Sequence, residues 1–178
     1  FKFNLKLYIS KAMSIKFDNN DQKFISNVDK ARKNRRNITP NGAVVPKREY
    51  HLEYNLVLRS WCELIKKITK KDEKLLKLFR ITPNIRIKFG KELSENENRE
   101  LSTSVPHSDA WVEGPWGMNC FIPFIGDVKK NNLLFYEPKS KFEEKFLSDS
   151  PSYKKMQWVM KYYKPIKNLV PKIGHVHF

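Results

Sequence analysis

Hydrophobic residues in the first half of the chain recur mainly at helical spacing. Between about Lys47 and Thr69 they fall three and four residues apart, which predicts an amphipathic helix with one face in a core. This apolar face comprises Tyr54, Val57, Leu58, Trp61, Leu64, Ile65 and Ile68. A second, shorter helix is predicted directly after it, with an apolar face of Leu75, Leu76 and Phe79.

The pattern before Lys47 is weaker. Residues 1–15 alternate only loosely, which favours either a strand or a short helix. Residues 18–45 are rich in Asn, Asp, Lys and Arg, and this composition predicts a basic, loop-rich connector. Residues 1–46 are therefore expected to form an N-terminal arm or linker, and residues 47–178 a single domain.

Apolar runs in the second half are short, alternate with polar residues and are broken by Gly, Pro and Asn. This pattern predicts short strands at 82–90, 102–112, 117–125, 131–138 and 168–178. Between about 139 and 165 the apolar residues return to helical spacing, which predicts a helical insertion that covers the mouth of a barrel as a lid. The expected fold class is α+β with a mainly β core, an antiparallel barrel or sandwich backed by the N-terminal helices.

Composition adds two constraints. The chain has 178 residues, 40% of them hydrophobic and 13% aromatic, which is enough for one packed core and excludes wholesale disorder. The formal net charge is +16. Lys residues occur in every segment, so we interpret the charge as surface solvation before we interpret it as a site for a polyanion.

The two cysteines, Cys62 and Cys120, form no C-x-x-C or zinc-type spacing. Unpaired thiols of this kind favour a reducing, cytoplasmic setting. No apolar run approaches the length of a membrane span, so a membrane is not among the expected partners.

The chemistry of the chain concentrates at His107 and Asp109, its only His-x-Asp pair. On an extended strand, side chains two residues apart point to the same face, so an imidazole and a carboxylate would lie side by side. Taken alone, a surface histidine beside a turn-capping aspartate explains the pair better. Its place before a Trp and a Gly-Pro turn, at the mouth of a predicted barrel, favours two of the three ligands of a facial triad for non-haem Fe(II).

Four blocks in this region, VPHSDAW, GMNCFIPF, NNLLFYEPKS and PKIGHVHF, together resemble the Fe(II)/2-oxoglutarate-dependent oxygenases. Within that family the chain is most similar to bacterial oxygenases of carbohydrate-biosynthesis clusters, of the streptomycin-biosynthesis type, and to phytanoyl-CoA dioxygenase relatives. The resemblance spans about Thr82 to Phe178. It implies a double-stranded β-helix, a jelly-roll or cupin-like fold.

The resemblance also implies roles for individual residues. His107 and Asp109 would be iron ligands, and Asn119 would contact the cosubstrate 2-oxoglutarate. Arg86 would bind cosubstrate or substrate, although an exposed strand residue explains it equally well. Trp111 and Trp116 would wall the substrate pocket, or else simply pack in the core.

The third iron ligand of the family follows the Gly-initiated strand, in which this sequence ends. The resemblance therefore places that ligand beyond Phe178 and predicts that residues 1–178, with two of three ligands, bind iron poorly and show little turnover. The alternative is that His175 or His177 is itself the third ligand.

The function implied by the resemblance is hydroxylation of a sugar or sugar-derived precursor, with Fe(II), 2-oxoglutarate and O2. Two alternatives remain. A non-catalytic cupin-like binding module ranks second, and a basic nucleic-acid-binding protein that uses the KARKNRRN segment ranks last.

Overall fold

A computed structural model describes residues 1–33, 36–39, 42–69, 72, 74, 77, 79–89, 106–113, 119–130, 133–147, 150, 152–167 and 169–177. The chain divides into two compact units, Phe1–Glu92 and Leu93–Phe178, which we describe separately. Over the described ranges, no helix combines the length and the apolar character that crossing a membrane requires.

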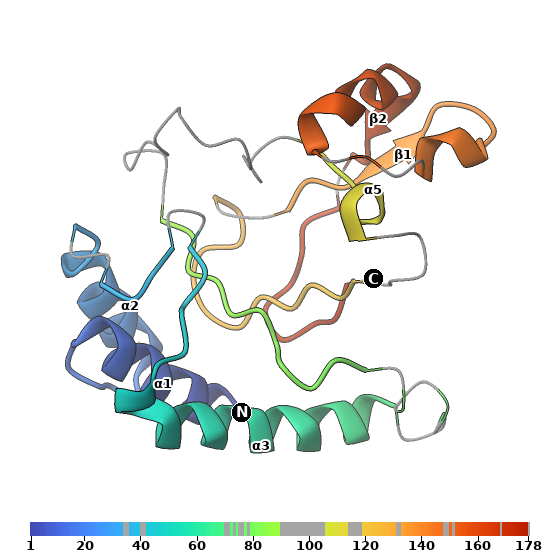
Figure 1. Cartoon of the computed structure of the whole chain (residues 1–178). Coiled ribbons are helices and arrows are strands. Elements are labelled where there is room, and N and C mark those ends of the chain that lie inside the picture. The colour runs from blue at the N-terminus through green and yellow to red at the C-terminus, as the bar shows by residue number, and fades with distance from the viewer. Residues whose placement is uncertain are drawn as a thin grey trace. The chain divides into compact units, whose positions relative to one another are not determined.

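The first unit is built on the pairing of two helices. Helix α1 packs against α3, and the two ribbons run side by side in Figure 1. The elements of this unit are α1 (Lys2–Met13), α2 (Asp21–Lys30), the 3-10 helix η1 (Arg48–Tyr50) and α3 (His51–Ile68). Helix α3 contributes one apolar face, whereas α1 buries a wide arc of its surface that includes Lys6 and Ser10. The buried hydrophobic residues are Leu5, Tyr8, Ile9, Ala12 and Met13 of α1 and Val57, Trp61 and Ile65 of α3.

An ion-pair network ties α2 to α1. Lys6 is almost fully buried, and its ammonium group lies 2.6 Å from the carboxylate of Asp21 and donates to the carbonyl of Asn19 at 2.5 Å. Lys2 binds the same carboxylate. The side chain of Asn20 accepts from the backbone N–H of Lys23 at 3.1 Å and so caps the start of α2. The buried ammonium group of Lys6 is tolerated because the carboxylate of Asp21 and the carbonyl of Asn19 both contact it.

The backbone at Gly42 lies close to that of Ile87. Gly42 follows Ile38 in a short turn closed by the bridge between Ile38 and Val44, and it has a φ of +88°. Its carbonyl accepts from the N–H of Ile87 at 2.8 Å, and Ala43 forms an isolated antiparallel bridge with Arg86. A Cβ at Gly42 would lie 2.2 Å from the carbonyl oxygen of Ile87. Only glycine fits this position.

The second unit has a small aromatic core and little regular β-structure. Strands β1 (Tyr136–Pro138) and β2 (Tyr163–Pro165) pair antiparallel, with Glu137 opposite Lys164. The other elements are helix α5 (Ala110–Glu113) and the 3-10 helices η2 (Glu144–Leu147) and η3 (Tyr153–Tyr162). Trp111, Phe146, Met156 and Val159 form the buried core, around which Tyr153, Met160, Tyr162 and Tyr163 pack.

The β-rich fold predicted from the sequence is wrong. The residues that the structure describes are mainly helical, with β1–β2 as their one sheet, and they contain no double-stranded β-helix, jelly-roll or cupin-like core. Three of the predicted strand segments touch a partner only at single bridges: 82–90 through Arg86 with Ala43, and 117–125 with 168–178 through Phe121 and His177. The segment predicted at 131–138 contains the short strand β1. Alternating apolar residues indicate extended backbone, but the prolines of these segments lack the N–H that a ladder needs.

The helix predictions were more accurate than the strand predictions. The helix expected at 47–69 is confirmed as η1 and α3. Of the strand and the short helix that the sequence left open for residues 1–15, the structure has the helix, α1. The connector predicted for 18–45 was partly wrong, since it contains α2. The insertion at 139–165 forms η2 and the 3-10 helix η3. The second helix expected after Thr69 falls mostly outside the described residues.

We expect Gly42→Ala to lower the free energy of unfolding by about 1–3 kcal/mol, because the new methyl group meets the Ile87 carbonyl and the φ is unfavourable for alanine. Gly174→Ala is the control, since Gly174 also has a positive φ but faces open space. Urea unfolding followed by circular dichroism measures both. Equal losses for the two variants would mean that the backbone angle alone matters.

Asp21 should contribute to acid sensitivity. The hydrogen bonds from Lys2, and then from Lys6, hold the pKa of Asp21 below its ordinary value of 3.8. A carboxylate with a depressed folded-state pKa stabilises the fold above its unfolded pKa, and that stability is lost as pH falls through the folded value. Asp21→Asn should therefore lose less stability than the wild type on acidification below about pH 5. Asp29→Asn removes the same charge from an exposed position of α2 and is the control.

Candidate functional site

Three side chains of the second unit, those of His107, Asn119 and Tyr153, meet at the carboxylate of Asp109. Nε2 of His107 lies 3.5 Å from Oδ1 of Asp109. The hydroxyl of Tyr153 donates to the same Oδ1 at 3.1 Å, and the amide of Asn119 donates to Oδ2. The rings of His107 and Tyr153 pack with centroids 4.4 Å apart. The pair that the sequence singled out is therefore the centre of a polar cluster.

The backbone brings His107 and Asp109 together differently from the prediction. His107 has no regular secondary structure and Asp109 lies in a turn that leads into α5, so the two are not on one strand. The N–H of Trp111 donates to the carbonyl of Ser108 at 3.1 Å and closes this turn. The juxtaposition comes from a turn and its contacts, not from the alternation of a strand.

Trp111 fixes the turn to the core. Its ring is buried, and its Nε1 donates to the carbonyl of Phe146 at 2.6 Å. The N–H of Ser150 donates to the Trp111 carbonyl at 2.7 Å. Of the two roles that the sequence left open for Trp111, the structure places it in core packing, while Trp116 lies outside the described residues.

The geometry of the pair fits two adjacent ligands of one metal ion. Cis ligands of an octahedral ion with bonds of about 2.1 Å lie about 3 Å apart, close to the observed 3.5 Å. A carboxylate has about four lone-pair sites, of which Tyr153 and Asn119 use two. Both side chains are partly exposed, His107 by 22% and Asp109 by 39%, so an ion can reach them from solvent.

A third ligand is not found beside the pair. Among the described residues, which include His175 and His177, no group of three His, Cys, Asp or Glu side chains could hold a metal ion. Nε2 of His177 accepts from the N–H of Lys172 at 3.2 Å, and its backbone pairs with Phe121. The described residues thus offer an ion two protein ligands.

The other predicted residues divide between the units. Asn119 binds the carboxylate of Asp109, a contact that the sequence did not predict. Arg86 belongs to the first unit, where its side chain is exposed and donates to Asn84 at 3.3 Å. Beside Asn119, burial raises the pKa of the Cys120 thiol, so this thiol stays protonated at neutral pH and is no activated nucleophile.

Tyr153 is the member of the cluster that the sequence did not identify as functional. It was counted among the apolar residues of the insertion, where an aromatic residue at helical spacing indicates core packing. Nothing in its local sequence relates it to Asp109, which lies 44 positions earlier. Only the tertiary structure brings the two together.

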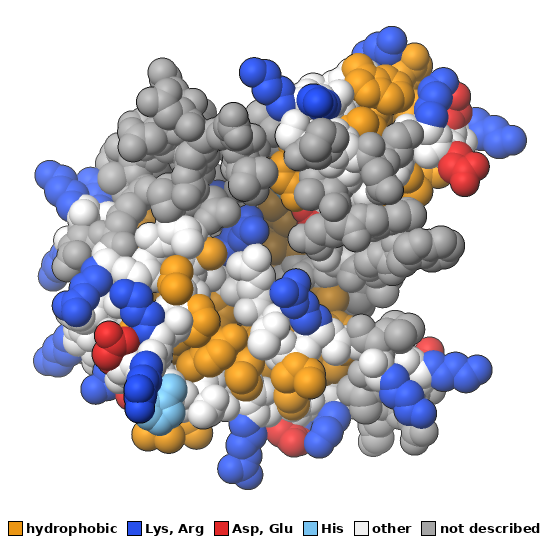
Figure 2. Space-filling view, viewed as in Figure 1, with side chains coloured by type: hydrophobic (Ala, Val, Ile, Leu, Met, Phe, Trp, Pro, Cys, Tyr) orange, Lys and Arg blue, Asp and Glu red, His pale blue; other side chains and the backbone are white. Residues whose placement is uncertain are grey.

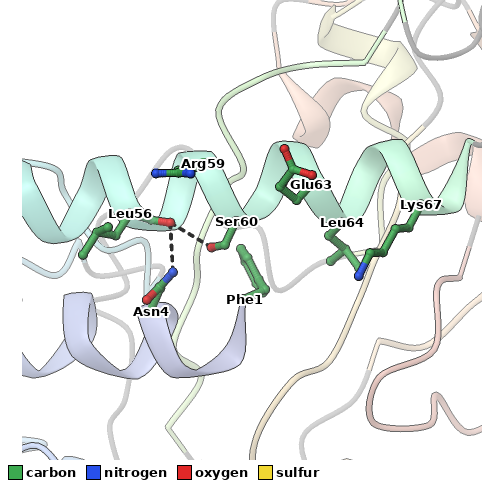
Figure 3. A pocket seen from close by; sticks show the side chains of 8 residues that line it. All are labelled: Phe1, Asn4, Leu56, Arg59, Ser60, Glu63, Leu64 and Lys67. Carbon is green, nitrogen blue, oxygen red and sulfur yellow. Dashed lines mark hydrogen bonds between the residues drawn. The ribbon is translucent and has the colours of Figure 1, made fainter.

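The first unit has a separate hollow of about 420 Å³ between α1 and α3 (Figure 3). Asn4 reaches across it to the carbonyl of Leu56 at 3.2 Å, and Arg59, Glu63 and Lys67 stand along α3. Its lining includes none of the candidate site residues that the sequence predicted. Among the residues that the structure describes, Lys and Arg side chains stand apart over much of the face shown in Figure 2.

Comparison of the chain with models of known protein families, with curated proteins and with solved structures found no match.

We expect Trp111→Phe to lower the stability of the second unit by about 1–3 kcal/mol, because the change leaves the buried carbonyl of Phe146 without its donor. Trp158→Phe is the control, since Trp158 is 41% exposed. Urea unfolding followed by near-ultraviolet circular dichroism compares them. An equal effect of the two substitutions would contradict the importance of this hydrogen bond.

Proposed function

We propose that the chain is an Fe(II)/2-oxoglutarate-dependent oxygenase, a hydroxylase, in which His107 and Asp109 bind the iron ion. The observation that carries the proposal is the 3.5 Å separation of Nε2 of His107 and Oδ1 of Asp109. The pair itself supports the choice of iron, since a histidine and a carboxylate are two members of the facial triad, while the four sequence blocks suggest 2-oxoglutarate by resemblance alone. The fold contributes nothing to this choice, because function resides in the site.

Bound iron would supply the oxidative chemistry that couples the breakdown of 2-oxoglutarate to hydroxylation of the substrate. The residues of the chain have simpler tasks. The imidazole of His107 would offer a nitrogen lone pair, and the carboxylate of Asp109 would offer the negative charge that a cation neutralises. Asn119 and Tyr153 hold the carboxylate by hydrogen bonds, so that Oδ1 stays turned toward His107. We propose a sugar or sugar-derived precursor as the substrate and the cytoplasm as the location, which the free thiols of Cys62 and Cys120 favour.

One observation favours a second candidate, a non-catalytic binding module. Both oxygens of Asp109 already accept hydrogen bonds, and among the described residues His107 is the only other ligand beside it. A site of this kind could bind a cation without turning over a substrate. The effect of 2-oxoglutarate on metal affinity distinguishes the two functions. A cosubstrate that coordinates the ion must increase the affinity of the protein for that ion, whereas a binding module has no such requirement.

The proposal predicts that residues 1–178 bind Mn(II), used in place of Fe(II) to avoid oxidation, through His107 and Asp109. His107→Ala and Asp109→Ala should each weaken binding by roughly tenfold or more, since removing a ligand costs at least as much as removing an outer partner. Titration followed by the electron paramagnetic resonance signal of free Mn(II) measures this. His51→Ala and Asp29→Ala, at exposed positions of the first unit, are the matched controls.

The same titration is repeated with 2-oxoglutarate and with glutarate, which lacks the 2-oxo group. An oxygenase should bind Mn(II) more tightly in the presence of 2-oxoglutarate, and glutarate should have little effect. Tight Mn(II) binding that ignores 2-oxoglutarate would favour the binding module. Mn(II) affinity that is unchanged in both His107→Ala and Asp109→Ala would contradict the proposed site.

A further inference from the structure

We infer that Tyr153 is a positioning residue that holds His107 and Asp109 in the arrangement a metal ion requires. This inference rests on the proposed function. Tyr153 contacts both members of the pair: its hydroxyl donates to Oδ1 of Asp109 at 3.1 Å, and its ring packs on the imidazole of His107 with centroids 4.4 Å apart. One rigid side chain thus constrains both ligands at once.

The contacts of the carboxylate determine what Tyr153 does. Asn119 holds Oδ2, and Tyr153 takes one of the two lone pairs of Oδ1. The same Oδ1 lies 3.5 Å from Nε2 of His107. Asp109 is thereby prepared to bind an ion through a single oxygen, with the rotation of its carboxylate fixed before the ion arrives. Hydrogen-bonded partners of ligating carboxylates orient them in this way.

Helix η3 anchors Tyr153 to the core of the second unit. A 3-10 helix has three residues per turn, so Tyr153, Met156 and Val159 lie in one row along its side. Met156 and Val159 are buried in the core beside Trp111, and Tyr153 ends the row at the polar cluster. Gln157 donates to the carbonyl of Pro106 at 2.8 Å and holds the segment just before His107. The region predicted to be a lid therefore supports the pair.

The test compares Tyr153→Phe, which removes only the hydroxyl, with Tyr162→Phe, the same change at the far end of η3. We expect Tyr153→Phe to weaken Mn(II) binding by roughly tenfold, the lower end of the range for loss of an outer partner, and Tyr162→Phe to leave it unchanged. Urea unfolding of both variants shows whether the fold persists. Tyr153→Leu, which also removes the ring from His107, should weaken binding further.

A double-mutant cycle excludes a merely structural role. If Tyr153 acts through the carboxylate, adding Tyr153→Phe to Asp109→Asn should cost little further Mn(II) affinity. Equal affinity of Tyr153→Phe and wild type, or an undiminished effect in the Asp109→Asn background, would overturn the inference while leaving the proposed function intact. Failure of the wild type to bind Mn(II) even weakly, at high metal concentration, would remove His107 and Asp109 as a metal pair and overturn the proposed function, and this inference with it.

Discussion

The polar cluster of the second unit depends on the burial of Trp111. Its ring joins Phe146 in the core, and its Nε1 donates to the Phe146 carbonyl at 2.6 Å. Asp109 lies two positions before Trp111, while Tyr153 begins the helix whose Met156 packs in the same core. One small aromatic core therefore fixes both sides of the cluster, although the segment that carries His107 has little regular structure. A site on a short loop needs such support, because its geometry must hold to within about half an ångström.

Sequence-based prediction was accurate where the hydrophobic pattern persisted over many residues, and inaccurate where it covered only a few. Helix α3 has a long apolar stripe and was predicted nearly to its ends. Helix α2 was missed, because it buries only Phe24 and its start depends on the cap from Asn20. The strand predictions failed for another reason. Alternation indicates extended backbone, but whether an extended segment finds a partner depends on tertiary contacts, as the single bridge between Phe121 and His177 illustrates.

The candidate site was predicted in part. Residue type and spacing singled out His107 and Asp109, and the order of motifs singled out Asn119, which the structure places beside them. The contact that Asn119 makes was not predictable, because a pattern of residues does not say which polar partner an amide will find. Tyr153 could not have been found at all from its own segment, where its spacing matches that of core residues. Its role depends on a contact across 44 positions.

The oxygenase proposal does not need the β-helix that the resemblance implied. A metal ion responds to the atoms around it: an imidazole nitrogen and a carboxylate oxygen 3.5 Å apart present the same pair whether a strand or a turn holds them. A turn differs from a strand in where the restraint comes from. Ladder hydrogen bonds would hold a strand, whereas here the restraint falls on the side chains of Asn119, Tyr153 and Gln157. These outer contacts should therefore matter more for metal affinity than they would on a sheet, because no backbone ladder shares the task.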